Sequence, residues 1–172
     1  MKTVFFDIDT QIDFLYPAGS LYVPGAERIV PLIAELNRAA PFVISTMCAH
    51  SEDDPEFRIY PHHCVVGTVG QKKPAATIVE NQFMLEKQQL DCFTNPRLMP
   101  LLQELNADRY VVYGVVTEVC VKFAAFGLLK TGKPVEIVSD AVCALNEADA
   151  RQMFTAFRAA GGRLTSESAL VG

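Results

Sequence analysis

The sequence lacks the features that mark membrane or secreted proteins. None of its apolar runs approaches the roughly 20 residues needed to cross a bilayer. Its first residues lead directly into a strand pattern, without a signal-peptide cleavage region. It has no C-x-x-C pair, and its five cysteines are widely spaced: Cys48, Cys64, Cys92, Cys120 and Cys143. An odd number of scattered cysteines favours reduced thiols over a disulfide framework, so we expect a cytoplasmic protein.

Basic patches and repeats are also missing. The chain has 15 Lys and Arg against 20 Asp and Glu, a formal net charge of −5, and no basic run. This balance argues against a nucleic-acid partner. No repeat or low-complexity segment interrupts the 172 residues, a length at which one domain buries a substantial core. We therefore expect a single domain over residues 1–172.

What the chain does contain is a regular alternation of short apolar strands and amphipathic helices. The predicted strands span residues 3–8, 42–47, 82–87, 110–115, 135–139 and 163–165, and the predicted helices span 25–38, 95–105, 118–131 and 146–160. Interleaving of this kind predicts a three-layer α/β/α fold of the doubly wound type, with a six-stranded, mainly parallel sheet. Sites in such folds lie outside the carboxyl ends of the strands.

Cys120 follows one of the predicted strands and lies in the first turn of the next predicted helix. Thr117 is a suitable N-cap for that helix. Free backbone N–H groups and the helix dipole would there favour the thiolate and lower the pKa of Cys120. A free cysteine near a strand end is also commonly a core residue, so the local sequence allows both interpretations.

Two charged residues are predicted to reach the same edge of the sheet. Asp9 follows the first predicted strand, and Lys87 ends the third. An acid, a cation and a thiol gathered there suit covalent acyl transfer, which needs a base, a nucleophile and a positive charge. Each has an ordinary alternative as well: Asp9 as a turn residue bonded to its own backbone, and Lys87 as a solvated strand-end lysine.

Four motifs resemble those of the isochorismatase-like cysteine hydrolases, and within them the nicotinamidase branch. DTQIDF at 9–14 resembles D-x-Q-x-D-F, GSLYVPGA at 19–26 resembles G-S-L-x-V-x-G, YPHHCVVGT at 60–68 resembles P-x-H-C-V-x-G-T, and GVVTEVCV at 114–121 resembles G-x-x-T-[DE]-x-C-V. Four motifs in one order are far more specific than any one alone. The resemblance implies hydrolysis of a small-molecule amide through a thioester, and a homo-oligomer.

The resemblance also implies roles for individual residues. It makes Asp9 the general base and acid, Lys87 the supporting cation and Cys120 the nucleophile. It further implies a cis peptide between Val115 and Val116, with the N–H groups of Val116 and Cys120 forming an oxyanion hole. The implied strand order, 3-2-1-4-5-6, puts the strand of Lys87 two places, or roughly 10 Å, from the first strand, so Lys87 must lean inward.

Substrate and metal residues follow from the same resemblance. Phe14 and Tyr60 occupy positions at which the family sandwiches a flat ring, although ordinary partly buried aromatics explain them equally well.

The nicotinamidase metal ligands, D-x-H and two further histidines, correspond here to Cys48, His50, Glu56 and His63. Zinc could be held by His50, Glu56 and His63, while Cys48 is either a further ligand or a core residue. The changed ligand set leaves other amides, ureido compounds and isochorismate-type vinyl ethers open as substrates, cleaved without a metal.

Two other functions fit parts of the sequence. Asp7 and Asp9 fit the D-x-D signature of haloacid-dehalogenase-like phosphatases. That class needs a later acidic cluster for magnesium, and only Asp140 follows the fifth predicted strand.

A catalytically inactive binding or scaffold protein is the other alternative. It has no physical need for an acid, a cation and a thiol on one edge, and these are present as Asp9, Lys87 and Cys120.

Overall fold

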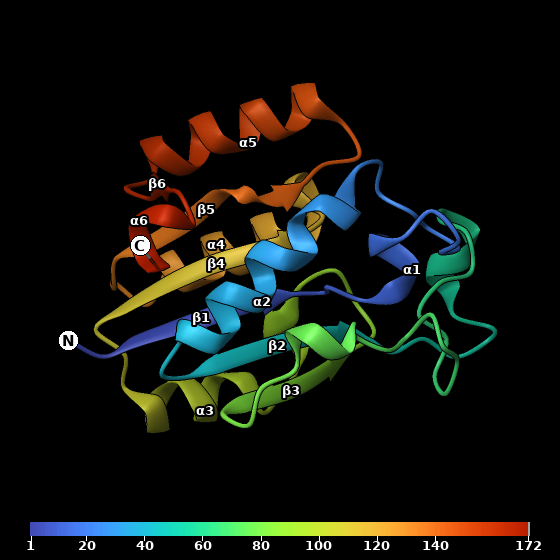
Figure 1. Cartoon of the computed structure of the whole chain (residues 1–172), viewed down its shortest axis with the longest axis horizontal. Coiled ribbons are helices and arrows are strands. Elements are labelled where there is room, and N and C mark those ends of the chain that lie inside the picture. The colour runs from blue at the N-terminus through green and yellow to red at the C-terminus, as the bar shows by residue number, and fades with distance from the viewer. Residues whose placement is uncertain (172) are drawn as a thin grey trace.

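The computed structural model describes residues 1–171 and contains one six-stranded sheet (Figure 1). Its strands are β1 (Thr3–Ile8), β2 (Val43–Cys48), β3 (Gln82–Lys87), β4 (Arg109–Val115), β5 (Val135–Cys143) and β6 (Arg163–Thr165). The spatial order is β3-β2-β1-β4-β5-β6, and every neighbouring pair is parallel. Helices cover both faces, so the predicted three-layer fold is confirmed.

The helices are α1 (Ile12–Leu15), α2 (Val30–Ala39), α3 (Leu98–Leu105), α4 (Lys122–Leu129), α5 (Glu147–Ala159) and α6 (Ser168–Val171). In Figure 1, α2 and α6 lie on the near face of the sheet and α3 and α4 on the far face, with α5 beside β6 and α4. Within residues 1–171, no helix has the length and apolar character needed to cross a membrane.

Two predicted helices begin differently from the expectation. The helix predicted from residue 25 starts as a 3₁₀ turn, η1 (Ala26–Ile29), before α2. The helix predicted from residue 118 starts as a π-helical turn, η5 (Thr117–Val121), before α4. Thr117 makes no cap, because Val116 holds the N-cap position and no side chain there accepts a hydrogen bond. The capping prediction is therefore wrong.

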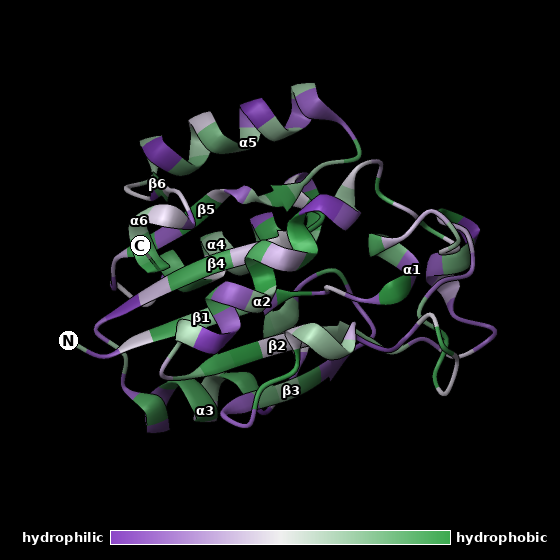
Figure 2. Ribbon diagram, viewed as in Figure 1, coloured by the Kyte–Doolittle hydropathy of each residue, from purple (hydrophilic) through white to green (hydrophobic). Residues whose placement is uncertain are grey.

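The apolar core is centred on the inner strands. All six residues of β1 are buried, as expected for a strand covered by helices on both faces. Figure 2 shows hydrophobic residues along β1, β2 and β4 and hydrophilic residues on the outer side of α5. β5 is longer than predicted because its pairing with β4 shifts register between Val112 and Gly114, which accommodates extra residues in β5.

A glycine lets the ends of β1 and β4 approach closely. Gly114 has φ +114°, and a Cβ added there would lie 2.2 Å from the carbonyl oxygen of Ile8. Only glycine fits this position. The close approach brings Asp9, directly after β1, next to the segment that leads from β4 into η5. The long loop over residues 49–74 lies at the same end of the sheet as α1 (Figure 1).

Candidate active site

Asp9, Lys87 and Cys120 come together at the carboxyl ends of β1, β3 and β4. The ammonium nitrogen of Lys87 lies 2.8 Å from Asp9 Oδ2 and 3.7 Å from Cys120 Sγ. All three residues are buried, with exposed fractions of 1%, 4% and 7% for Asp9, Lys87 and Cys120. The predicted gathering of acid, cation and thiol at one edge is confirmed.

Lys87 reaches Asp9 by passing over the end of β2. Lys87 pairs in register with Cys48, and its Nζ lies 3.4 Å from Cys48 Sγ on the way to Asp9. A lysine side chain is long enough to span the intervening strand. Lys87 therefore leans inward, as its predicted role requires.

Asp9 is turned toward this group by its backbone. Its φ is +48°, a left-handed conformation that aspartate tolerates better than most residues and that is often found at functional sites. One carboxylate oxygen accepts a 2.6 Å hydrogen bond from the Thr46 hydroxyl. Burial alone would raise the pKa of Asp9, but the charge and hydrogen bond of Lys87, with the Thr46 bond, lower it below the ordinary value.

The partners of Asp9 have raised pKa values. Burial disfavours the charged form of Lys87 and would lower its pKa. The attraction of Asp9 and the neighbouring sulfurs is stronger, so the pKa of Lys87 lies well above its usual range. A hydrogen bond with the Cys48 thiol and burial raise the pKa of Cys120 well above the ordinary value, although Lys87 acts in the opposite direction. The expected lowering of the Cys120 pKa by a helix start is therefore wrong. The resting site holds a carboxylate, an ammonium and a neutral thiol.

The backbone around Cys120 is irregular. The peptide between Val115 and Val116 is cis. The Val116 carbonyl accepts hydrogen bonds from the N–H groups of Val119 and Val121, at 3.0 and 3.1 Å, and none from the Cys120 N–H between them. Single π-helical turns of this kind occur frequently at functional sites.

A small cavity adjoins the Cys120 thiol. Its volume is about 20 Å³, little more than a water molecule occupies. Both predicted ring-binding residues, Phe14 and Tyr60, line it, together with Cys48, Glu56, His63, Leu21, Leu90, Leu145 and the segment Val115, Val116, Val119 and Cys120. An outer cavity of about 650 Å³ shares Glu56, Tyr60 and Leu90 with the inner one. These three residues lie between the two cavities.

Two histidines and Glu56 form a second cluster beside this cavity. Oε1 of Glu56 lies 3.5 Å from His63 Nε2 and 4.0 Å from His50 Nε2. Nδ1 of His63 is at hydrogen-bond distance from the Pro61 carbonyl, and Nδ1 of His50 is 2.9 Å from Asp54 Oδ2. Each ring therefore turns its Nε2 toward Glu56. Among the described residues, His50 Nε2 is buried without a hydrogen-bond partner.

Asp54 was not recognised from the sequence. Its carboxylate orients His50 and also accepts the N–H of Glu56 as the N-cap of a short 3₁₀ helix, η2 (Pro55–Arg58). The sequence signal was available, because Asp followed by Pro is typical of a helix start. Its link to His50 appears only in three dimensions. Carboxylates that orient a ligating histidine in this way are a regular part of metal sites.

Other motif residues connect the segments that carry the site. Gln11 is buried, and its amide donates to the Cys48 carbonyl at 2.8 Å and accepts the Cys48 N–H at 2.7 Å. Asp13 accepts the N–H of Cys64, next to His63, at 2.7 Å. A Cβ on Gly70 would lie 2.1 Å from the Asp13 carboxylate, so glycine is required there. These contacts fasten the end of β2 and the long loop to β1.

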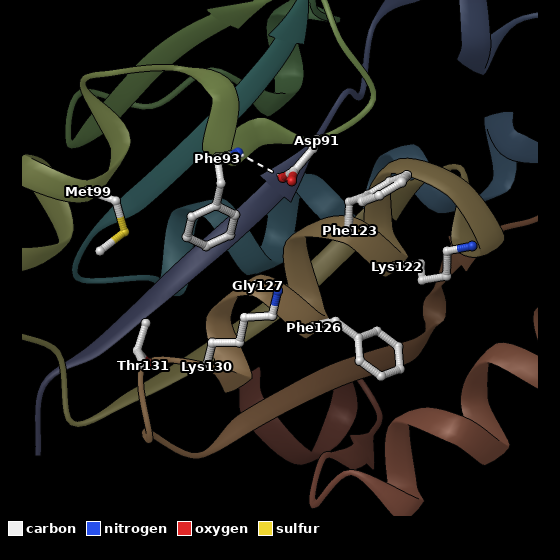
Figure 3. A pocket seen from close by; sticks show the side chains of 9 residues that line it. All are labelled: Asp91, Phe93, Met99, Lys122, Phe123, Phe126, Gly127, Lys130 and Thr131. Atoms are coloured by element: carbon white, nitrogen blue, oxygen red, sulfur yellow. Dashed lines mark hydrogen bonds between the residues drawn. The ribbon is translucent and has the colours of Figure 1, made fainter.

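A much larger cavity lies elsewhere. It has a volume of about 680 Å³ and is lined by α4, by Met99 of α3 and by the residues around η4 (Cys92–Thr94). Figure 3 shows its aromatic residues, among them Phe93, Phe123 and Phe126, and Asp91, whose carboxylate accepts the Phe93 N–H. This cavity contains neither a thiol nor a histidine, so the cavity beside Cys120 is the better candidate.

The phosphatase interpretation finds no support at Asp7. Asp7 is fully buried and accepts hydrogen bonds from Thr10, Asn37 and Ser45, besides an ion pair with Lys73. A nucleophile held in this way has no free face for a phosphate ester.

Comparison with known proteins identifies the family. The isochorismatase domain model matches residues 3–169. The nicotinamidase of Acinetobacter baylyi is 25% identical, covering 81% of this chain and 80% of that protein. The pyrazinamidase of Pyrococcus horikoshii, solved in complex with zinc, superposes with a TM-score of 0.89 at 26% identity, covering 96% and 99%. PnC1 of L. infantum, solved in complex with nicotinate, superposes with a TM-score of 0.91 at 28% identity, covering 99% and 95%. The chain belongs to the isochorismatase family and is a hydrolase related to the nicotinamidases.

Proposed function

We propose that this enzyme hydrolyses the amide of a small, flat, ring-containing molecule of the nicotinamide class, with Cys120 as nucleophile. The observation that carries the proposal is the contact of Lys87 with both Asp9 and Cys120 beside a cavity lined by aromatic rings. A buried carboxylate, ammonium and thiol in contact supply a base, a stabilising charge and a nucleophile together.

In the proposed reaction, the Asp9 carboxylate takes the Cys120 proton as the sulfur attacks the amide carbon. The oxyanion that forms is stabilised by the N–H groups of Val116 and Cys120. One observation supports that role: the Cys120 N–H makes no bond to the Val116 carbonyl. Asp9 then passes the proton to the leaving nitrogen, and ammonia departs.

Hydrolysis of the thioester repeats the proton transfers with water in place of the thiol. Asp9 accepts a proton from water, the new oxygen attacks the acyl carbon, and the thiolate leaves and recovers its proton. Lys87 keeps Asp9 ionised at rest and offsets the charge that develops on sulfur, since its ammonium contacts both groups. The acid product then leaves.

Phe14 and Tyr60 are proposed to hold the substrate ring. Both line the cavity beside Cys120, and both rings lie close to His63, with centroid separations of 5.3 and 6.4 Å. The cavity of about 20 Å³ is far smaller than a six-membered ring, so entry requires movement of the residues that separate it from the outer cavity. Tyr60 and Leu90 are the residues with side chains suited to swing aside.

The second cluster fits a divalent metal such as zinc. His50, His63 and Glu56 form a His₂Glu set, one of the ligand sets of catalytic zinc sites. The fit rests on two buried histidines with their Nδ1 atoms engaged and on a buried His50 Nε2 without a partner among residues 1–171. A bound metal would supply a Lewis acid that holds an electron-rich atom of the substrate.

Cys48 is better placed on the side of the acid and the cation. Its sulfur lies 3.4 Å from Lys87 Nζ and 3.6 Å from Asp9 Oδ2. We assign the metal to the three residues above, although the ligand atoms of Cys48, His50 and His63 also lie within 4.8 Å of one another and Cys48 is within reach of the same ion. Five free, buried cysteines also support a reducing compartment such as the cytoplasm. The homo-oligomer stays a prediction.

The test is an ammonia-release screen over nicotinamide, other small amides, ureido compounds and an isochorismate-type vinyl ether, with and without a chelator. Cys120→Ala should lose activity by at least about 10⁴-fold. Cys143→Ala is the matched control, because Cys143 is also buried at a neighbouring strand end and its thiol bonds the Gly25 carbonyl instead. Full amide hydrolysis by Cys120→Ala would overturn the proposal.

A further inference from the structure

Cys48 has no part in amide hydrolysis as proposed, yet its thiol faces the nucleophile. The Cys48 and Cys120 sulfurs lie 3.4 and 3.7 Å from the same ammonium nitrogen, that of Lys87. Both thiols therefore contact one cation from the ends of neighbouring elements of the site. Both residues line the cavity beside Cys120. A small oxidant that enters this cavity therefore comes close to both cysteines.

We propose that Cys48 is a resolving cysteine: hydrogen peroxide oxidises Cys120, and Cys48 then closes a Cys48–Cys120 disulfide that reversibly inactivates the enzyme. The inactivation rests on the proposed function. The disulfide itself follows from the position of the two thiols.

The chemistry balances in two steps. The Cys120 sulfur attacks one peroxide oxygen, the O–O bond breaks, and a sulfenic acid and one water form. The Cys48 sulfur then attacks the Cys120 sulfur, the S–O bond breaks, a second water leaves and the S–S bond forms. Peroxide is reduced, and two thiols are oxidised to one disulfide. A dithiol reductant reverses the change by thiol–disulfide exchange.

The other cysteines are less suited to this reaction. The Cys64 and Cys143 thiols donate to the carbonyls of Gly70 and Gly25, at 3.9 and 3.8 Å. Burial raises the pKa of the Cys92 thiol, and Cys92 does not line the cavity beside Cys120. Lys87, by contrast, contacts both thiols of the proposed pair.

The backbone also favours the pair. Cys48 is held at its N–H and its carbonyl by the Gln11 side chain, so its sulfur keeps its position. Cys120 lies in the π-helical turn η5. Rotation of the Cys120 side chain, with adjustment of that turn, is the movement that bond formation requires. In the oxidised enzyme Cys120 has lost its nucleophile.

The experiment treats the purified full-length chain with a few equivalents of hydrogen peroxide. Free thiols are then blocked with iodoacetamide, and peptides are mapped by mass spectrometry without reduction. We expect a Cys48–Cys120 linked peptide, loss of ammonia release with the same time course, and recovery after dithiothreitol. Cys92→Ala should form the same link.

Cys48→Ala provides the decisive contrast. Mass spectrometry reports the oxidation state of Cys120 in this variant whether or not the variant is active. In this variant Cys120 should proceed to sulfinic and sulfonic acids that dithiothreitol does not restore. A wild-type chain whose Cys120 is oxidised without the link, or is linked to another cysteine, overturns the inference and leaves the amide proposal intact. A link that forms in a chain without amidase activity in the screen leaves the disulfide standing and overturns the proposed function.

Discussion

Asp7 in β1 and Asp9 directly after it each pair with a lysine, and the two pairs are surrounded very differently. Asp9 and Lys87 are 2.8 Å apart, and so are Asp7 and Lys73. All four residues are buried. Burial and ion pairing are therefore common to both, and neither is enough to identify a catalytic group.

The difference lies in what else contacts each carboxylate. Asp7 is satisfied by Thr10, Asn37 and Ser45, and Asn37 in turn accepts from the Tyr113 hydroxyl. Asp9 accepts hydrogen bonds from the Thr46 hydroxyl and the Cys48 thiol. Its partner Lys87 contacts the Cys48 thiol and also the Cys120 thiol. A fully hydrogen-bonded pair holds the fold together, whereas a pair beside thiols and a cavity can move a proton.

Replacing Asp9 by Asn should have the largest effect on activity. The change keeps the shape and removes the base, so kcat/KM should fall by about 10³- to 10⁴-fold. Steady-state ammonia release measures it. Wild-type kcat/KM in this variant would show that Asp9 is as structural as Asp7.

Replacing Asp7 by Asn should instead affect stability. An unpaired Lys73 would remain buried, which costs about 3–5 kcal/mol in the free energy of unfolding. Urea denaturation measures this loss, and activity per folded molecule should stay within a few-fold of wild type. Adding Lys73→Met should recover part of the stability, because the orphaned charge is removed. If fully folded Asp7→Asn lost as much activity as Asp9→Asn, the two aspartate–lysine pairs would not differ in function.

The metal cluster depends on its own aspartate. Asp54→Asn weakens the acceptor that orients His50, so zinc affinity should fall about 10- to 100-fold in a titration against a competing chelator. Asp53→Asn is the matched control, since Asp53 is exposed and adjacent. Equal zinc affinity in the two variants would refute the assigned orientation.

Ring binding should depend on Phe14. Phe14→Leu removes one aromatic face from the cavity, so KM should rise roughly 3- to 10-fold with little change in kcat. Phe42→Leu makes the same substitution at the opposite end of the sheet, before β2, and should leave KM unchanged. A kcat that falls as much as KM rises would indicate a role in the chemistry.

The smallest expected effect is that of pH. The Asp9 pKa lies below its ordinary value of about 3.9, so the carboxylate is ionised above about pH 5. The Cys120 pKa lies above its ordinary value of about 8.5, so the thiol stays protonated through neutrality. The profile of kcat/KM should therefore be flat between about pH 5 and pH 8. A tenfold rise per pH unit within that range would mean that a thiolate forms before substrate binds.

The sequence predicted the sheet well because buried parallel strands have a strong apolar pattern. The bounds of β1, β3 and β6 agree with the prediction. β5 was predicted too short because the register shift at Val112 and Gly114 depends on its neighbour, not on its own residues. The π-helical start of η5 was missed for the same reason, since local propensity cannot distinguish it from an ordinary helix start.

The sequence predicted that Asp9, Lys87 and Cys120 would come together, but it did not predict the electrostatics around them. Asp9, Lys87 and Cys120 meet because each lies at or just beyond the carboxyl end of a strand of one parallel sheet. The raised pKa of Cys120 follows from burial and from the Cys48 thiol, which a strand pattern does not place. Lys73 lies in the long loop over residues 49–74, and only the folded loop carries it to Asp7. Long-range contacts of this kind need the tertiary structure.

The central claim, that the Cys120 sulfur attacks the substrate carbonyl, is tested most directly with an aldehyde analogue of the best amide, labelled with ¹³C at the carbonyl carbon. Bound to the wild-type enzyme, its carbon resonance should move to the tetrahedral range of a thiohemiacetal, and in Cys120→Ala it should not. An aldehyde that inhibits the wild-type enzyme but keeps its carbonyl resonance, or that shifts equally in Cys120→Ala, would contradict the account.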